Sequence, residues 1–152
     1  MKETTIRMAT VEDVPVIHRL LSELENTLGA TSKIKRKAED LGKFGFSDDP
    51  LFEALIAWKG EEAVGLALYF RESSTWLGKP GVYVQDLYVA PSQRGTGLGS
   101  KLMHAVYDRA RGWSASYCKL MVHTDNEAAI AFYKRLGFHI VSGEHVLIHA
   151  LP

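Results

Sequence analysis

Three glycines in five residues, Gly95, Gly97 and Gly99, follow a run of β-forming residues and precede an amphipathic run. Glycine lets the backbone turn tightly and approach a ligand closely, because it has no Cβ. A helix that begins directly after such a turn presents free N–H groups and the positive end of its dipole, and both favour phosphate. Residues 94–100 therefore predict a loop that binds a phosphate-bearing ligand, and the alternative is an ordinary glycine-rich turn.

Two widespread phosphate-binding motifs do not fit this segment. The Walker loop needs a glycine followed directly by lysine, whereas Ser100 stands between Gly99 and Lys101. The dinucleotide fingerprint needs the spacing G-x-G-x-x-G, and the spacing here is G-x-G-x-G. The pattern that fits is R-x-x-G-x-G, which begins at Arg94 and lies between a predicted strand and a predicted helix.

A second segment, residues 126–138, reads N-E-A-A-I-A-F-Y-K-R-L-G-F. Together with the R-x-x-G-x-G loop it resembles the GNAT superfamily of acyl-CoA-dependent N-acetyltransferases, and the resemblance covers nearly the whole chain. It implies that the Asn126 side chain contacts the co-substrate and that Tyr133 lies near its sulfur as a general acid. From the residues alone, Tyr133 also fits a core aromatic of an amphipathic helix, and Asn126 also fits a helix N-cap.

The same resemblance implies acetyl-CoA as co-substrate, with the glycine loop as the cradle of its pyrophosphate. The strand before the loop is then expected to pair with the pantetheine amides, and one of its N–H groups to hold the thioester oxygen. The residues expected to contact acetyl-CoA are Leu87, Tyr88, Val89, Arg94, Gly95, Thr96, Gly97, Leu98, Gly99, Ser100 and Asn126. No metal is expected, because only His145 and His149 share a strand face and no third ligand has matching spacing.

The closer resemblance is to the spermidine/spermine N-acetyltransferase-like branch. It rests on F-S-D-D-P-L-F at 46–52, A-L-Y-F at 67–70 and W-L-G-K-P-G-V-Y-V-Q-D-L-Y-V at 76–89. That branch acetylates primary amines of polyamines, diamines or lysine-like amino acids, and it typically carries Tyr-Leu-Glu-Asp on this strand. Here Gln85 takes the place of the Glu, and glutamine neither accepts a proton nor attracts an ammonium group as a carboxylate does. This departure weakens the polyamine assignment more than the acetyltransferase assignment.

Acetyl transfer to an amine also needs proton transfers. Alkylammonium groups have a pKa near ~10.4, so a base must take the proton directly or through water. Asp86 is the candidate base, and a structural or substrate-anchoring carboxylate is the alternative. Tyr133 would protonate the departing thiolate, whose parent thiol has a pKa near ~8.5. By resemblance, Trp76, Gln85 and Asp86 contact the acceptor, together with Glu23 or Glu25 of the first predicted helix, although these two acids also fit a solvated helix face.

Hydrophobic periodicity predicts the elements that position these residues. Strands are expected at 5–8, 51–58, 63–71, 82–89 and 117–123, with a last hairpin of 138–141 and 146–149. Helices are expected at 11–28, 31–41, from the glycine loop to about 111, and at 128–136, with turns at 59–61 and 79–81. The result is an α/β GNAT fold, a mixed and mostly antiparallel sheet of about six or seven strands flanked by about four helices.

The composition indicates one compact domain over residues 1–152, with 46% hydrophobic and 24% charged residues. Eighteen basic and 18 acidic side chains give zero net charge, which argues against binding to nucleic acid or an anionic membrane. Lys33, Lys35, Arg36 and Lys37 form a basic cluster that fits a solvated helix face; the alternative is a contact with an outer phosphate or an acidic partner. A signal-peptide core and a bilayer-spanning run of roughly 18 apolar residues are both missing, so we expect a cytoplasmic protein.

These features predict an acetyl-CoA-dependent enzyme that acetylates the primary amine of a small molecule by direct attack. The acceptor classes are a diamine, a polyamine or a lysine-like amino acid. One alternative is acetylation of a protein lysine or N-terminus, and another is a non-catalytic acyl-CoA-binding sensor domain. The resemblance also implies a homodimer.

Overall fold

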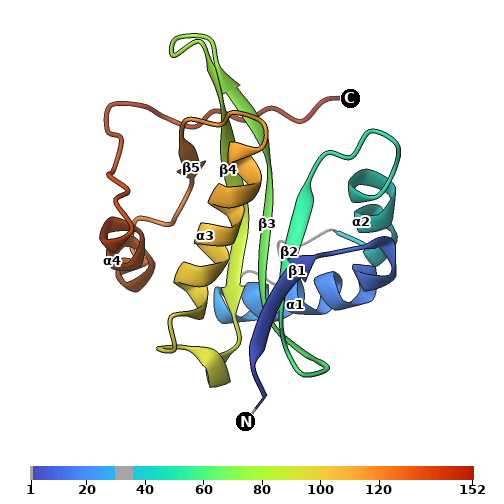
Figure 1. Cartoon of the computed structure of the whole chain (residues 1–152). Coiled ribbons are helices and arrows are strands. Elements are labelled where there is room, and N and C mark those ends of the chain that lie inside the picture. The colour runs from blue at the N-terminus through green and yellow to red at the C-terminus, as the bar shows by residue number, and fades with distance from the viewer. Residues whose placement is uncertain (1, 30–35) are drawn as a thin grey trace. The chain divides into compact units, whose positions relative to one another are not determined.

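The computed structural model describes residues 2–29 and 36–152 (Figure 1). The chain divides into two compact units, one ending at Leu120 and one beginning at Met121. The first unit contains strands β1 (Thr4–Met8), β2 (Glu53–Lys59), β3 (Glu62–Ser74), β4 (Lys79–Val89) and β5 (Cys118–Leu120). Its helices are α1 (Val14–Thr27), α2 (Ala38–Gly45) and α3 (Leu98–Arg111), with 3-10 turns η1 (Val11–Asp13) and η3 (Pro91–Gln93). The second unit contains α4 (Glu127–Arg135).

The sheet order is β1-β2-β3-β4-β5, and every neighbouring pair is antiparallel except β4 and β5, which are parallel. The predicted α/β architecture with a mixed, mostly antiparallel sheet and four helices is therefore confirmed. The described residues form five strands rather than the six or seven expected.

Helices cover both faces of the sheet. On one face, Ile17, Leu20 and Leu21 of α1 join Leu66 and Tyr88 of the sheet in one apolar cluster. On the other face lies α3, whose Leu102 side chain stands 3.0 Å from the place where a Cβ of Gly65 would lie. Since adjacent residues of a strand point to opposite faces, Gly65 and Leu66 show that α1 and α3 cover opposite sides.

A capping bond precedes α1, and α2 departs from its predicted range. The Thr10 N–H donates to Asp13 Oδ2 at 2.9 Å, and the 3-10 turn η1 then leads into α1. The predicted helix at 31–41 lies partly outside the described residues, and α2 continues past the expected stop to Gly45. Gly45 is a close-packing position, because an ideal Cβ there would come within 2.2–2.9 Å of the Phe52 ring.

The turn between β3 and β4 lies at other residues than the sequence predicted. Residues 79–81 lie in β4, where Lys79 pairs with Ser74 and Pro80 with Ser73. The turn occupies residues 75–78 instead, and Gly78 supplies the left-handed φ of 67° that closes it. The hairpin is therefore longer than the sequence predicted, while the shorter β2–β3 hairpin around residues 59–61 is confirmed.

Two further strand predictions were wrong. The strand expected at 117–123 is only Cys118–Leu120, because its parallel ladder with β4 ends where β4 changes register with β3. The hairpin expected from residues 138–149 is absent, since that part of the described chain carries no strand ladder. An alternating apolar pattern needs a hydrogen-bonded neighbour to become a strand, and Leu147 and Ile148 stay exposed instead.

Candidate functional site

The glycine loop has the backbone that a phosphate site requires. Gly95 and Gly97 have φ of 76° and 86°, and a Cβ added at either would meet nothing within 4 Å. Gly97 is the N-cap of α3, and the first helical bond runs from the Lys101 N–H to the Gly97 carbonyl at 3.1 Å. The first-turn N–H groups of Leu98, Gly99 and Ser100 therefore have no acceptor within the helix. They form, with the dipole of α3, a site that fits an anion.

The loop is anchored to the strand that precedes it. Arg94 Nε donates to the Val89 carbonyl at 3.2 Å, and the Thr96 hydroxyl donates to the Gln93 carbonyl. Both bonds hold the loop at the end of β4 while the side chains of Arg94 and Thr96 stay exposed. The loop is therefore fixed before any ligand arrives, which lowers the entropic cost of binding.

Strand β4 contains an irregularity at Gln85. Leu68 of β3 pairs with Asp86 and Tyr69 pairs with Val84, so Gln85 has no partner in β3. Such a bulge bends a strand, and the ladder with β5 ends beside it at Val84. Within the first unit, residues 86–89 therefore have one edge paired with β3 and one edge without a ladder. That second edge includes the backbone of Leu87 and Val89 and suits an extended ligand with amide groups.

Asp86 faces the α1 side of the sheet. Tyr88, two residues further along β4, belongs to the apolar cluster under α1, and side chains two apart in a strand share a face. The Asp86 side chain is half-buried. Burial, together with the negative charge of Glu25, raises its pKa to about 6, while Arg36 acts in the opposite direction. Asp86 is therefore a carboxylate at neutral pH with a greater proton affinity than an exposed aspartate.

The acid of α1 that acts on Asp86 is Glu25. Arg36 holds it with two bonds, Nη2 to Oε1 at 2.7 Å and Nη1 to Oε2 at 3.0 Å. Glu23, the other acid that the sequence suggested, pairs instead with Arg19 at 2.9 Å and keeps 40% of its side chain exposed. Glu25 follows the buried Leu21 by four residues, so the two side chains lie on the same side of α1.

The Glu25–Arg36 pair also corrects part of the interpretation of the basic cluster as a solvated helix face. Lys33 and Lys35 lie outside the described residues. The Arg36 side chain is only 19% exposed and lies before α2, so it does not belong to a solvated helix face.

Trp76 and Gln85 are exposed residues of the same hairpin. Trp76 is 98% exposed at the tip, whereas Asp86 lies seven residues beyond Lys79 in β4. At about 3.3 Å per residue that separation is roughly 23 Å. One chain therefore does not bring Trp76 to Asp86.

In the second unit, Asn126 and Tyr133 lie on α4. The Asn126 side chain accepts a hydrogen bond from the Ala129 N–H at 3.2 Å, so its predicted role as N-cap is confirmed. The Tyr133 ring packs edge-on against Phe132 and Phe138, with centroids 5.1 and 5.5 Å apart. These ring contacts fix the plane of the tyrosine.

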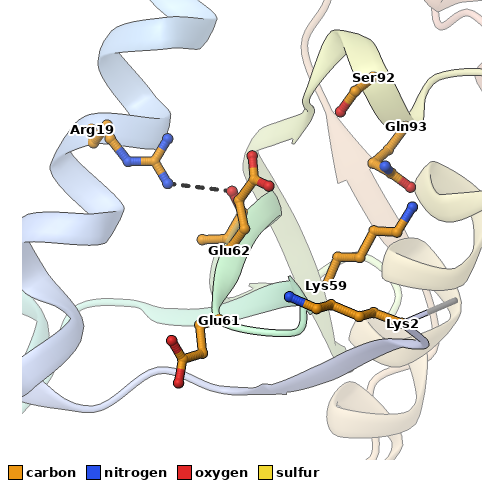
Figure 2. A pocket seen from close by; sticks show the side chains of 8 residues that line it. Lys2, Arg19, Lys59, Glu61, Glu62, Ser92 and Gln93 are labelled. Carbon is orange, nitrogen blue, oxygen red and sulfur yellow. Dashed lines mark hydrogen bonds between the residues drawn. The ribbon is translucent and has the colours of Figure 1, made fainter.

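A hollow of about 770 Å³ lies in the first unit near the glycine loop (Figure 2). Its lining residues are Lys2, Arg19, Lys59, Glu61, Glu62, Ala63, Ser92 and Gln93. Arg19 Nη2 donates to the Ala63 carbonyl at 3.3 Å and crosses from α1 to the sheet (Figure 2). Three basic and two acidic side chains line it, so the hollow carries both signs of charge.

Two features are missing from residues 2–29 and 36–152. No group of three or more His, Cys, Asp or Glu residues there could hold a metal ion. No helix there is long and apolar enough to cross a membrane.

Comparisons with known proteins give consistent similarities. The family model described as Acetyltransferase (GNAT) family matches residues 17–138. The chain is 34% identical over 145 residues to thialysine N-epsilon-acetyltransferase of Mus musculus, covering 90% of this chain and 85% of that protein. It is 32% identical over 146 residues to spermidine/spermine N(1)-acetyltransferase-like protein 1 of Homo sapiens, covering 91% of this chain and 21% of that protein. A solved aminoglycoside acetyltransferase from an uncultured soil metagenomic sample, in complex with sisomicin, superposes with a TM-score of 0.80 at 17% identity, covering 98% of this chain and 97% of that chain.

Proposed function

The chain belongs to the acetyltransferase (GNAT) family, and from this premise we propose that it transfers an acetyl group from acetyl-CoA to the primary amine of a small molecule. The proposed acceptor is a diamine, a polyamine or a lysine-like amino acid, and the amine attacks the thioester directly. The observation that carries the proposal is the half-buried Asp86 carboxylate on the strand that leads into the glycine loop. The names of the thialysine and spermidine/spermine relatives support an amine acceptor.

Acetyl-CoA supplies the activated acetyl group as a thioester. The residues proposed to hold its pyrophosphate are Gly95, Gly97 and the first turn of α3, because the Cβ positions of both glycines face open space and the first-turn N–H groups have no acceptor within the helix. The free edge of residues 87–89 is proposed to bind the amides of the pantetheine arm. Asn126 is proposed to contact acetyl-CoA from α4 while it caps that helix. Residues 1–152 act as one acetyltransferase domain in this proposal, since the family model spans both units.

Asp86 is proposed to accept the proton of the substrate ammonium, directly or through a water molecule. An alkylammonium pKa of ~10.4 makes this transfer unfavourable for an ordinary aspartate. Burial raises the pKa of Asp86 from 3.8 to about 6, which improves the proton-transfer equilibrium about a hundredfold. The environment of Asp86 therefore supports a base more than a salt-bridge partner, whose pKa would be lowered.

Tyr133 is proposed to protonate the departing thiolate. Tyr133→Phe is expected to lower kcat roughly 10- to 100-fold, because it removes one proton donor and keeps the ring that packs on Phe132 and Phe138. The dissociation constant of acetyl-CoA should stay within about a factor of three of the parent value. Steady-state kinetics and calorimetric titration measure the two quantities. Unchanged kcat in the variant would remove Tyr133 from the mechanism.

The proposed function is tested by coenzyme A release from acetyl-CoA with a panel of amines. The panel contains putrescine, cadaverine, spermidine, spermine, lysine, thialysine, an arylamine and a lysine peptide, each over a pH series. Acceptor-dependent release is expected with at least one aliphatic amine, with an acid limb in kcat/KM near pH 6. Release with the peptide alone would favour a protein acetyltransferase. Binding of acetyl-CoA without release for any amine would favour the sensor alternative.

The enzyme is further proposed to act as a homodimer. The exposed Trp76 and Leu77 at the hairpin tip support this, because an isolated apolar tip gains by burial. The separation of Trp76 from Asp86 within one chain also supports a dimer, because a Trp76 that contacts the acceptor beside Asp86 must come from the other copy. Light scattering after gel filtration should give twice the 16.9 kDa chain mass, and Trp76→Ser should shift the equilibrium toward the monomer. A monomeric parent protein would contradict the proposal.

A further inference from the structure

We propose that Glu25 and Arg36 are positioning residues for Asp86, acting as one buried ion pair beside the acceptor amine. The inference rests on the proposed function, because it assigns a role next to the proposed base. Neither residue touches the reacting atoms in this proposal. Their role is to set the electrostatic environment in which Asp86 works.

The geometry of the pair is that of a fixed structural unit. Both terminal nitrogens of Arg36 bond to the Glu25 carboxylate, at 2.7 and 3.0 Å, and Arg36 Nε lies 3.4 Å from His18 Nδ1. Only 13% of the Glu25 side chain and 19% of the Arg36 side chain are exposed. Bidentate arginine–carboxylate pairs with this burial hold their orientation, so the two charges stay at fixed positions.

The pair links α1 to the residue just before α2, on the face of the sheet to which Asp86 points. Asp86 is adjacent in the β3–β4 ladder to Leu68, which belongs to the apolar cluster with Leu20 and Leu41. Both charges act on Asp86 from that side, Glu25 favouring its protonated form and Arg36 its ionised form. A partly buried group feels such charges more strongly than an exposed one, because water screens them less.

Other charged groups around Asp86 have different partners. On α1, Arg19 and Glu23 pair with each other, and after burial Glu23 is the largest cause of the raised pKa of Tyr88. On β4, the charge of Asp86 itself contributes to the raised pKa of Tyr83, after burial and Glu72. On α2, the Asp40 carboxylate accepts from the Lys37 N–H at the helix start. Among the described residues, Glu25 and Arg36 are therefore the charged pair directed at Asp86, with His18 attached through Arg36.

Two opposite shifts follow from this arrangement. Arg36→Gln removes the positive charge and leaves Glu25 facing Asp86, so the acid limb of kcat/KM should move to higher pH by roughly one unit. Glu25→Gln removes the negative charge and leaves Arg36 facing Asp86, so the limb should move to lower pH by a similar amount. The double variant should return close to the parent limb, because both charges are gone.

Control variants separate this effect from structural damage. Glu39→Gln removes an exposed acid of α2 that has no proposed role in the site, and it should leave the limb within about 0.2 pH units of the parent. Arg36→Lys keeps the positive charge and loses the bidentate geometry, so the acid limb of kcat/KM should stay close to that of the parent. This variant tests the role of the charge if Arg36→Gln does not fold. The inference would be overturned if the pH midpoint of the acid limb stays unchanged in Arg36→Gln and Glu25→Gln, or moves in the same direction in both.

A readout independent of activity distinguishes this inference from the proposed function. The carboxyl carbon of Asp86 is followed by NMR over pH 4–8 in the parent and in both single variants. Opposite shifts of the Asp86 titration in the two variants support the inference even if no amine in the panel is acetylated. The absence of acetylation would contradict only the proposed function. If coenzyme A release depends on the acceptor but the pKa of Asp86 is the same in the parent and in both variants, the inference is wrong and the proposed function stands.

Discussion

Asp86→Asn lowers kcat/KM for the best acceptor by about 10²- to 10⁴-fold at pH 7.5, the range that general acid–base catalysis contributes. Asparagine has nearly the same shape and still forms hydrogen bonds, but it does not accept a proton from an ammonium group. The loss should therefore fall on the transfer step, and the dissociation constant of acetyl-CoA should change little. Steady-state kinetics with the best acceptor, together with calorimetric titration of acetyl-CoA, measure both quantities.

The matched control for this variant is Asp49→Asn, which makes the same chemical change at an exposed position. It should leave kcat/KM within about a factor of two of the parent. An Asp86→Asn enzyme that keeps a third or more of the parent activity would assign Asp86 to anchoring or structure. The proton would then have to leave the substrate by another route.

The same substitution has a consequence for stability. Because the pKa of Asp86 is raised from 3.8 to about 6 in the folded state, the folded protein binds more protons than the unfolded chain between those pH values. Its contribution to stability is therefore present below pH 4 and is lost as pH rises through 6. Asp86→Asn avoids this loss and should raise the free energy of unfolding at pH 7.5 by about 1–2 kcal/mol, after allowing for partial exposure. Denaturant titrations at pH 4 and 7.5 test it, and a gain of equal size at both would contradict the assignment.

Gly97→Val should weaken acetyl-CoA binding roughly 100-fold or more. A valine Cβ would project into the open space in front of the loop, where no protein atom lies within 4 Å. It would also disfavour the φ of 86° that directs the loop N–H groups. Losing two hydrogen bonds to a charged phosphate, at about 1.5–3 kcal/mol each, accounts for the size of the effect. Calorimetry with acetyl-CoA and with free coenzyme A measures it.

The matched control for this variant is Gly29→Val, because Gly29 also has a positive φ, 68°, and open space around its Cβ position. It carries the same backbone strain, of order 1–3 kcal/mol, at a position that follows α1 in the chain. Both variants should lose stability to a similar extent, and only Gly97→Val should lose acetyl-CoA affinity. An unchanged affinity in Gly97→Val would remove the loop from the binding site.

The local parts of the fold could be predicted because their signals are local. The α1 stripe of Ile17, Leu20 and Leu21, the β2–β3 hairpin and the glycine-capped start of α3 each depend on a few neighbouring residues. The predicted turn at 79–81 was wrong because glycines stand on both sides of Pro80, at positions 78 and 81, and only Gly78 adopts the left-handed conformation. The predicted last hairpin was wrong because alternation supplies a strand pattern without supplying a partner.

The candidate site divides in the same way. The glycine loop and Asp86 lie within 14 residues of each other in the chain, 86–99, and their motifs could be recognised without any tertiary structure. The Glu25–Arg36 pair could not be, because it joins side chains 11 residues apart whose meeting depends on how the chain returns to the sheet. Choosing between Glu23 and Glu25 required the rotation of α1 about its axis. Finding that Gln85 has no partner required the register of β3 against β4.

Because Gln85 is unpaired, the residue type at this position can change the local charge of the strand without changing the packing of the core. Its side chain is exposed and its residue lies outside the β3 ladder, so packing and pairing place little demand on its identity. An exchange between glutamine and glutamate there changes the charge next to Asp86 by one unit while leaving the core under α1 untouched. Substitutions at position 85 are therefore expected to change the local charge of the strand without lowering the stability of the fold.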